Sequence, residues 1–171
     1  MIVQTPWFDR KFQSGLPAGL FPCLVERLRG TPIRIEALIS GIDEMLLNRK
    51  PDNSWSIKEH IGHMADLEAL HDGRLEDYLA GKKLLRATDL QNKATDEADH
   101  NSKSIAALLH YFRQVRMNFI EKVEQLDDQM LNAVSVHPRL QQPMNLVDMV
   151  SFVCEHDDHH LAKMRRLLKN G

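Results

Sequence analysis

The stretch Cys154-Glu155-His156-Asp157-Asp158-His159-His160-Leu161 lies in a segment whose apolar residues recur at helical spacing. His156 and His160 are four positions apart, so on a helix they stack on one face, about 6 Å apart in rise. Two imidazoles placed in this way can reach one metal ion and leave room for a third ligand from elsewhere in the chain. The spacing H-x-x-x-H is a weak signal by itself, because pairs of histidines also occur on polar surface helices.

The composition is that of an ordinary globular protein, with 171 residues of which 43% are hydrophobic and 27% are charged. This length predicts a single domain over residues 1–171 with its own core. The formal charge of −2 argues against nucleic acid as a partner. Because no apolar run approaches the roughly 20 residues of a membrane span and the first residues lack signal-peptide features, we expect a cytoplasmic protein without membrane contact. Cys23 and Cys154 stand in apolar helical contexts and are expected to be reduced core thiols.

The first part of the chain predicts an irregular arm followed by two helical segments. Residues 1–17 are expected to form an apolar arm that lies against the body. Gly30-Thr31-Pro32 predicts a kink, or a break into two short helices, within the helical segment 18–46. Ser56-Ile57-Lys58-Glu59 matches a capping box, so a second helix is expected from Ser56 to Gly81.

Two further helices are predicted, with a long connection before each of them: the polar residues 82–101 before the first and residues 127–144 before the second. An apolar stripe over 105–126 indicates the third helix, for which Asn101 or Ser102 can serve as the cap. Asn145 can cap the fourth, which is expected to run to about residue 169. The connections are too long for tight turns, and no alternating strand pattern occurs. These features predict an all-α fold, a four-helix bundle with long crossover loops.

A helical wheel of the fourth helix separates its histidines. Asp157 falls within the apolar stripe, His156 and His160 fall at its margin, and His159 leans outward. A buried carboxylate is costly unless it is paired with a cation, a metal or hydrogen-bond donors. One hypothesis is a metal site in which Asp157 orients a ligand imidazole. The other is a helix that lies across the bundle, with both histidines at a wet margin and Asp157 paired with an arginine.

The third ligand must come from a neighbouring helix, and His63 is the natural candidate. The capping box fixes the start of its helix and therefore the direction of its side chain. His60 lies one turn earlier and could substitute, but it occupies a position that suits a hydrophobic staple with Trp55. We interpret His71 as a core-margin histidine with a local hydrogen bond and His110 as a solvated histidine.

Two motifs resemble those of the DinB-like superfamily. The stretch WSIKEHIGHMAD, Trp55 to Asp66, resembles its W-S-x-x-E-x-x-x-H-x-x-D segment, and Glu155 to Arg165 resembles its C-terminal H-x-x-H-H-x-x-x-x-R helix. The resemblance implies a four-helix bundle that binds one divalent ion through His63, His156 and His160. Members of the superfamily include transferases that join a low-molecular-weight thiol (bacillithiol, mycothiol or glutathione) to an electrophile. Others are described as metal-dependent hydrolases, and homodimers are common.

The implied site predicts metal-dependent chemistry on a small molecule. Three neutral imidazoles leave an open coordination position, as in catalytic zinc sites, and nickel would be accommodated too. In a thiol S-transferase a metal-bound thiolate attacks the electrophile, whereas in a hydrolase a metal-bound water is the nucleophile. A non-catalytic bundle that binds metal or mediates dimerisation is the alternative. The resemblance and the length of the loop suggest four pocket residues: Asn92, Thr95, His100 and Asn101.

Overall fold

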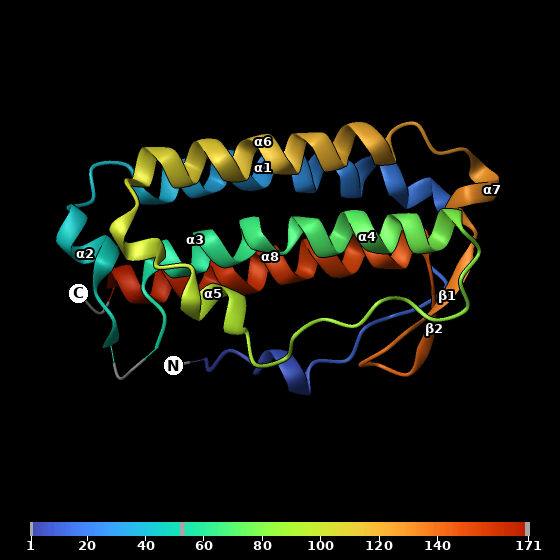
Figure 1. Ribbon diagram of the computed structural model, residues 1–171, viewed down its shortest axis with the longest axis horizontal. Helices are drawn as coiled ribbons and strands as arrows, with labels where there is room; N and C mark the ends of the chain where they lie inside the picture. Colours follow the sequence, from blue (N-terminus) through green and yellow to red (C-terminus); the bar gives the residue numbers. More distant parts are fainter. Residues whose placement is uncertain (1, 52–53, 170–171) are drawn as a thin grey trace.

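The structure, a computed structural model, describes residues 2–51 and 54–169. Four long helical rods lie side by side (Figure 1). They are α1 (Phe21–Ile39), the consecutive helices α3 (Ile57–Asp66) and α4 (Glu68–Leu79), α6 (Ile105–Val123), and α8 (Leu146–Lys169). The predicted all-α four-helix bundle is confirmed.

The direction of the rods explains one of the two long connections. In Figure 1, α1 and α8 run one way along the bundle, whereas α3, α4 and α6 run the other way. Because α4 and α6 are parallel, the segment 80–104 must cross the whole length of the bundle to join them. The segment 124–145 joins helices of opposite direction and stays at one end. The prediction of long crossover loops therefore holds for the first connection and is wrong for the second.

The first helical segment, expected to be one kinked helix or two short ones, forms two helices. The break between them is not at Pro32. Pro32 lies inside α1, and the helix ends at Ile39. Gly41 follows with a φ of 72°, a left-handed conformation that glycine adopts without steric cost. The short helix α2 (Glu44–Asn48) then begins with Asp43 as its cap, whose side chain accepts a hydrogen bond from the backbone N–H of Met45.

The capping box predicted at the start of the second rod is present. The Ser56 hydroxyl accepts a hydrogen bond from the backbone N–H of Glu59 at 3.1 Å, and the Glu59 carboxylate accepts one from the backbone N–H of Ser56 at 2.8 Å. The rod is interrupted once, at Leu67, and Gly81 follows its end with a φ of 65°. This firm start determines where the side chains of the first two turns of α3 point.

The crossover contains two short helical turns that fasten it to α3. These are α5 (Lys93–Glu97) and the 3-10 turn η4 (His100–Ser102). Because η4 occupies the positions expected to cap the third rod, α6 begins later, with Ser104 as its cap. The predicted cap at Asn101 or Ser102 is therefore wrong.

The second connection holds a small hairpin that the sequence pattern does not predict. A short helix α7 (Asp128–Leu131) leads into β1 (Val134–His137) and β2 (Gln142–Asn145), which pair antiparallel with Val134 opposite Asn145. Strands of four residues, one of them containing a proline, give almost no alternating pattern. The predicted cap of the last rod is confirmed, because Asn145 and Asp148 exchange two backbone-to-side-chain hydrogen bonds of 2.8 Å.

The bundle core consists of two apolar clusters with a buried ion network between them. One cluster gathers around Phe119 and Val150 and the other around Ile61 and Phe112. Between them, Arg116 of α6 is fully buried and pairs with both Glu68 and Asp157. A buried charge left without its partner is strongly destabilising, so these three side chains depend on one another.

This network predicts a loss of stability in acid. Burial by itself would raise the pKa of Glu68, but Arg116 and His71 outweigh burial and lower the pKa from 4.5 to about 2. Because the folded pKa lies below the unfolded one, the stabilisation is fully present above pH 4.5 and is lost as the pH falls toward 2. Urea unfolding followed by circular dichroism should show this decline in the wild type and a weaker one in Glu68→Gln. An equal decline in both proteins would contradict the assignment to Glu68.

The N-terminal arm lies against α8, as predicted. Its 3-10 turn η1 (Trp7–Asp9) places the Trp7 ring edge-on to Phe152, with ring centroids 5.1 Å apart, and a second turn η2 (Ala18–Leu20) leads into α1.

Cys154 is buried as expected, but Cys23 is exposed, so the expectation of two core thiols is wrong for Cys23. Within 2–51 and 54–169, no helix has the length and apolar character needed to span a membrane.

Candidate metal centre

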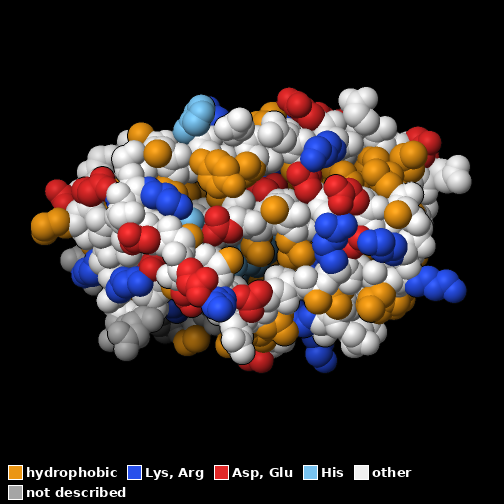
Figure 2. All heavy atoms as spheres, in the orientation of Figure 1, with side chains coloured by type: hydrophobic (Ala, Val, Ile, Leu, Met, Phe, Trp, Pro, Cys, Tyr) orange, Lys and Arg blue, Asp and Glu red, His pale blue; other side chains and the backbone are white. Residues whose placement is uncertain are grey.

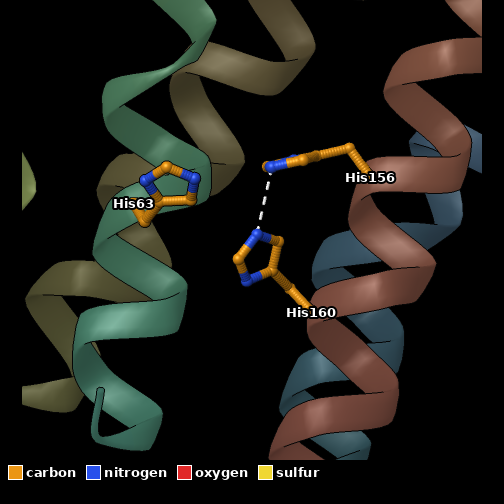
Figure 3. A group of neighbouring side chains, drawn as sticks. All are labelled: His63, His156 and His160. Atoms are coloured by element: carbon orange, nitrogen blue, oxygen red, sulfur yellow. Dashed lines mark hydrogen bonds between the residues drawn. The ribbon is translucent and has the colours of Figure 1, made fainter. Parts of the chain in front are cut away.

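Three histidines from two rods converge between α3 and α8. Figure 3 shows His63 on α3 facing His156 and His160 on α8. One ring nitrogen from each lies within 4.8 Å of the others, and all three side chains are buried. The Nε2 atoms of His156 and His160 are 3.0 Å apart. The structure therefore brings together the same three histidines that the sequence motifs indicate.

Neighbouring side chains fix two of the three rings through their second nitrogen. The Nδ1 atom of His63 is 3.0 Å from the Thr95 hydroxyl, and Nδ1 of His160 is 2.9 Å from Nδ1 of His60. Both contacts leave Nε2 available to a metal ion, and Nε2 of His160 faces that of His156. His156 differs, because its Nδ1 is buried without a hydrogen-bond partner among the described residues. Its ring is held instead by edge-on packing against Trp7, at 5.0 Å between centroids.

Burial keeps these imidazoles neutral near pH 7. It lowers the pKa of His63 to about 4 and that of His60 to about 3, because a charged ring is poorly solvated there. Burial also lowers the pKa values of His156 and His160 well below 6.5, and the neighbouring histidines lower them further. Neutral imidazole is the form that coordinates a metal, so the cluster is already in its ligating state.

Asp157 does not orient a ligand histidine, which corrects the first of our two hypotheses for this residue. Its carboxylate accepts hydrogen bonds from Arg116 and, at 2.8 Å, from the Thr31 hydroxyl. The second hypothesis paired Asp157 with an arginine, and that part is correct. Its other part is wrong, because His156 and His160 lie buried in the bundle and not at a wet margin. The supporting contacts to the rings come from His60 and Thr95.

Two other histidines also differ from the sequence-based expectation. His159 is buried, not outward, because the N-terminal arm covers it and Gln4 Nε2 lies 3.0 Å from its Nδ1. It stays outside the cluster, as the resemblance implied. His60 packs against Trp55 as expected, with centroids 5.5 Å apart, but it also contacts His160. His60 and His63 are three residues apart on one helix face, and this spacing could have indicated that His60 also contacts the cluster.

The cluster forms part of the wall of a cavity of about 390 Å³. The face of the molecule drawn in Figure 2 is hollowed near its middle. Trp7, Trp55 and Phe152 contribute aromatic walls, from the arm, the start of α3 and α8 respectively. The cavity is thus closed by segments that lie far apart in the sequence.

Of the four predicted pocket residues, one lines the cavity. Asn92 does so, whereas Thr95 contacts His63 from behind. His100 and Asn101 hold the crossover against α3 and do not line the cavity: His100 Nε2 is 2.8 Å from the Asp66 carboxylate, and Asn101 accepts a 2.7 Å hydrogen bond from the Ser56 hydroxyl. The prediction is therefore wrong for Thr95, His100 and Asn101, whose side chains contact α3 and its cap instead of lining the cavity.

Gly62 permits this attachment, which leads to a prediction. A Cβ atom at Gly62 would lie 2.3 Å from Cγ of His100, so Gly62→Ala must push η4 and the neighbouring Thr95 away from α3. We expect metal affinity to fall about tenfold, the usual effect of losing a contact that orients a ligand. Titration with a competing chelator would measure it. Gly30→Ala is the matched control, because a Cβ there meets no atom within 4 Å; equal affinity in both variants would contradict the prediction.

The fold and the cluster define a class of protein: a four-helix bundle with three buried histidines at the wall of a cavity. The chain belongs to the DinB superfamily, whose family model matches residues 27–164. Among solved structures it is similar to YfiT from Bacillus subtilis, described as a probable metal-dependent hydrolase with an unusual four-helix bundle topology. The TM-score is 0.80, with 17% identity over 95% of this chain and 93% of that chain, a likeness that shows the fold. No curated protein matches the sequence significantly.

Proposed function

We propose that the protein binds one divalent metal ion through His63, His156 and His160 and uses it to transfer a low-molecular-weight thiol to an electrophilic small molecule. The observation that supports this most is the number of ligands. Within the described part of the chain, the group contains three histidines and no fourth histidine, cysteine or carboxylate. Structural zinc sites use four protein ligands, whereas catalytic sites use three and keep a position open.

The donor set suits the proposed ion. Imidazole nitrogen favours zinc, nickel and other first-row ions over magnesium or calcium, and we propose zinc or nickel. Thr95 and His60 contact Nδ1 of His63 and His160, which leaves Nε2 of both rings for the ion. A divalent ion held there would supply a Lewis acid that lowers the pKa of a thiol or water in the open position.

The cavity wall favours a thiol as the nucleophile. Asp89 is the one carboxylate among the described cavity-lining residues, and its oxygens accept hydrogen bonds from the backbone N–H groups of Gln91 and Lys93. Metal-dependent peptidases of the H-E-x-x-H type place a glutamate beside the metal as general base, and within 2–51 and 54–169 no carboxylate joins the group of three histidines. A thiol, with an ordinary pKa of about 8.5, loses its proton far more readily than water and needs no such base.

Hydrolysis is the second candidate, and the description of YfiT as a probable metal-dependent hydrolase favours it. The same three histidines and the same open position would serve both reactions. What separates them is whether the protein requires a thiol.

A paired assay of the zinc- or nickel-loaded protein tests the proposal. In the first arm, 1-chloro-2,4-dinitrobenzene is offered with glutathione, bacillithiol or mycothiol; an S–C bond forms, chloride leaves and the thiol proton is released. In the second arm, p-nitrophenyl acetate is offered without thiol. We expect turnover in the first arm that is lost in His63→Ala. Turnover confined to the second arm would establish the hydrolase, and a fully metal-loaded protein inactive in both would contradict the transferase.

A further inference from the structure

Apart from Nδ1 of His156 in the histidine cluster, three hydrogen-bond donors in the same cavity have no partner among the described residues. They are Nη2 of Arg74, Nη2 of Arg139 and Nε2 of His137, and each atom is buried. The Arg74 and His137 side chains are 3% and 2% exposed, and all three residues line the cavity that contains the histidine cluster. Buried polar groups are rarely left unpaired, so three in one place require an explanation.

The contacts of His137 show that its Nε2 is a donor. Its Nδ1 lies 3.3 Å from the backbone nitrogens of Arg139 and Leu140, whose N–H groups donate to it. Nδ1 therefore carries the lone pair, and in the neutral ring the proton must be on Nε2. All three unpartnered groups can thus donate hydrogen bonds and none of them can accept one.

Arg74 is unusual because it is a buried cation without an ion-pair partner in the described structure. Its Nε donates to the Arg86 carbonyl at 3.2 Å, and the nearby Asp77 is already paired with Lys82 and Arg86. Burial lowers the pKa of Arg74 to about 10, and the charge of Arg139 acts in the same direction, yet Arg74 stays charged near neutral pH. A charge in such surroundings is costly unless an anion accompanies it.

Arg139 projects from the hairpin turn into aromatic surroundings. Its guanidinium lies 5.3 Å from the Phe8 ring centroid and 5.9 Å from that of Trp7, without a carboxylate partner among the described residues. Stacking on aromatic faces fixes the plane of a guanidinium and leaves its edge free for a ligand.

These donors lie next to the proposed metal centre. Trp7 contacts the His156 ring at 5.0 Å and the Arg139 guanidinium at 5.9 Å. Phe152 lies one helical turn before His156 and contacts the His137 ring at 5.0 Å. The two groups are therefore offset by about one helical turn, roughly 6 Å along α8, within reach of one small molecule.

The charge of the cavity also indicates an anionic ligand. Its lining includes four cationic side chains, Arg74, Arg139, Lys163 and Arg166, against the single carboxylate of Asp89. An electropositive cavity with unpartnered donors at one end selects an anion.

We propose that Arg74, Arg139 and His137 form a carboxylate-binding subsite, which holds the anionic end of the substrate while its reacting atom lies at the three histidines. The planar fork of a guanidinium matches a carboxylate, and the His137 N–H supplies a further donor. The assignment of the reacting end rests on the proposed function. The carboxylate subsite itself does not.

Isothermal titration of the zinc-loaded protein with benzoate and with benzamide, its neutral analogue, tests the subsite. We expect benzoate to bind at least tenfold more tightly, and Arg74→Gln and Arg139→Gln each to remove most of that preference without changing the metal content. Arg166→Gln, which removes a charge from the same cavity, should change benzoate affinity less than twofold. Equal binding of the two probes, an equal effect of all three substitutions, or tighter binding of phenyl phosphate than of benzoate would overturn the proposal.

A second pair of measurements separates this proposal from that of the metal site. Benzoate should still bind His63→Ala, because the arginines hold it; loss of binding there would show that benzoate coordinates the metal and would overturn the subsite. Arg74→Met should unfold at the same temperature as the wild type or higher, because it removes an uncompensated charge, whereas a structural role predicts a lower temperature. If Arg74 variants fail to fold, the test rests on Arg139→Gln, on the partly exposed hairpin turn. Retention of the full preference for benzoate over benzamide in this variant would then overturn the proposal. Failure of the wild type to bind metal would refute the proposed function and leave the subsite standing.

Discussion

Replacement of His63 by alanine is expected to abolish stoichiometric metal binding. The three ring nitrogens lie within 4.8 Å of one another, and the other two ligands come from a single helix. Two imidazoles four residues apart on α8 cannot close the site alone, so the loss should be close to complete. Elemental analysis of the purified variant, with circular dichroism to verify its fold, measures the effect.

His159→Ala is the matched control for this experiment. His159 is equally buried and adjacent to His160 in sequence, yet its Nδ1 contacts Gln4 and its ring lies outside the group of three. Metal content should therefore match that of the wild type. Full occupancy in His63→Ala, or an equal loss in both variants, would refute the three-ligand assignment.

Arg116→Met is expected to destabilise the fold by about 3–5 kcal/mol, the usual result of removing one partner of a buried ion pair. The substitution leaves the carboxylates of Glu68 and Asp157 buried without their cation. Thr31 still donates to Asp157, but a neutral hydroxyl cannot replace the guanidinium. The free energy of unfolding, obtained from urea titration, measures the loss.

Arg113→Met, three residues earlier on α6, provides the comparison. Arg113 pairs with Glu36 at the surface, where an ion pair contributes no more than about 1 kcal/mol. Comparable losses in the two variants would show that Arg116 contributes as a surface residue does. The account of the buried network would then be wrong.

The features predictable from the sequence are those that depend on neighbouring residues. The capping box of Ser56 and Glu59 is a local pattern, and it correctly gave the start of α3 and hence the direction of His63. The spacing of His156 and His160 determined that they share a face. The apolar stripes of the rods gave the bundle, because burial along a helix repeats with its own period.

The features that escaped prediction depend on contacts between distant segments. The wheel placed His159 outward because it could not include the N-terminal arm, which covers that residue. The partner of Asp157 is Arg116 on another rod, and nothing near either residue in the sequence indicates that pair. Arg74 and Arg139 meet in the cavity only because the hairpin folds over the end of the bundle, so their common role had no local signature.

Anomalous diffraction at the absorption edge of the bound metal, from crystals of the purified protein, tests the central claim most directly. The account predicts one ion about 2.1 Å from Nε2 of His63, His156 and His160, with the remaining coordination filled by solvent or a small molecule. An ion bound elsewhere, or one enclosed by a fourth protein ligand at this position, would contradict it.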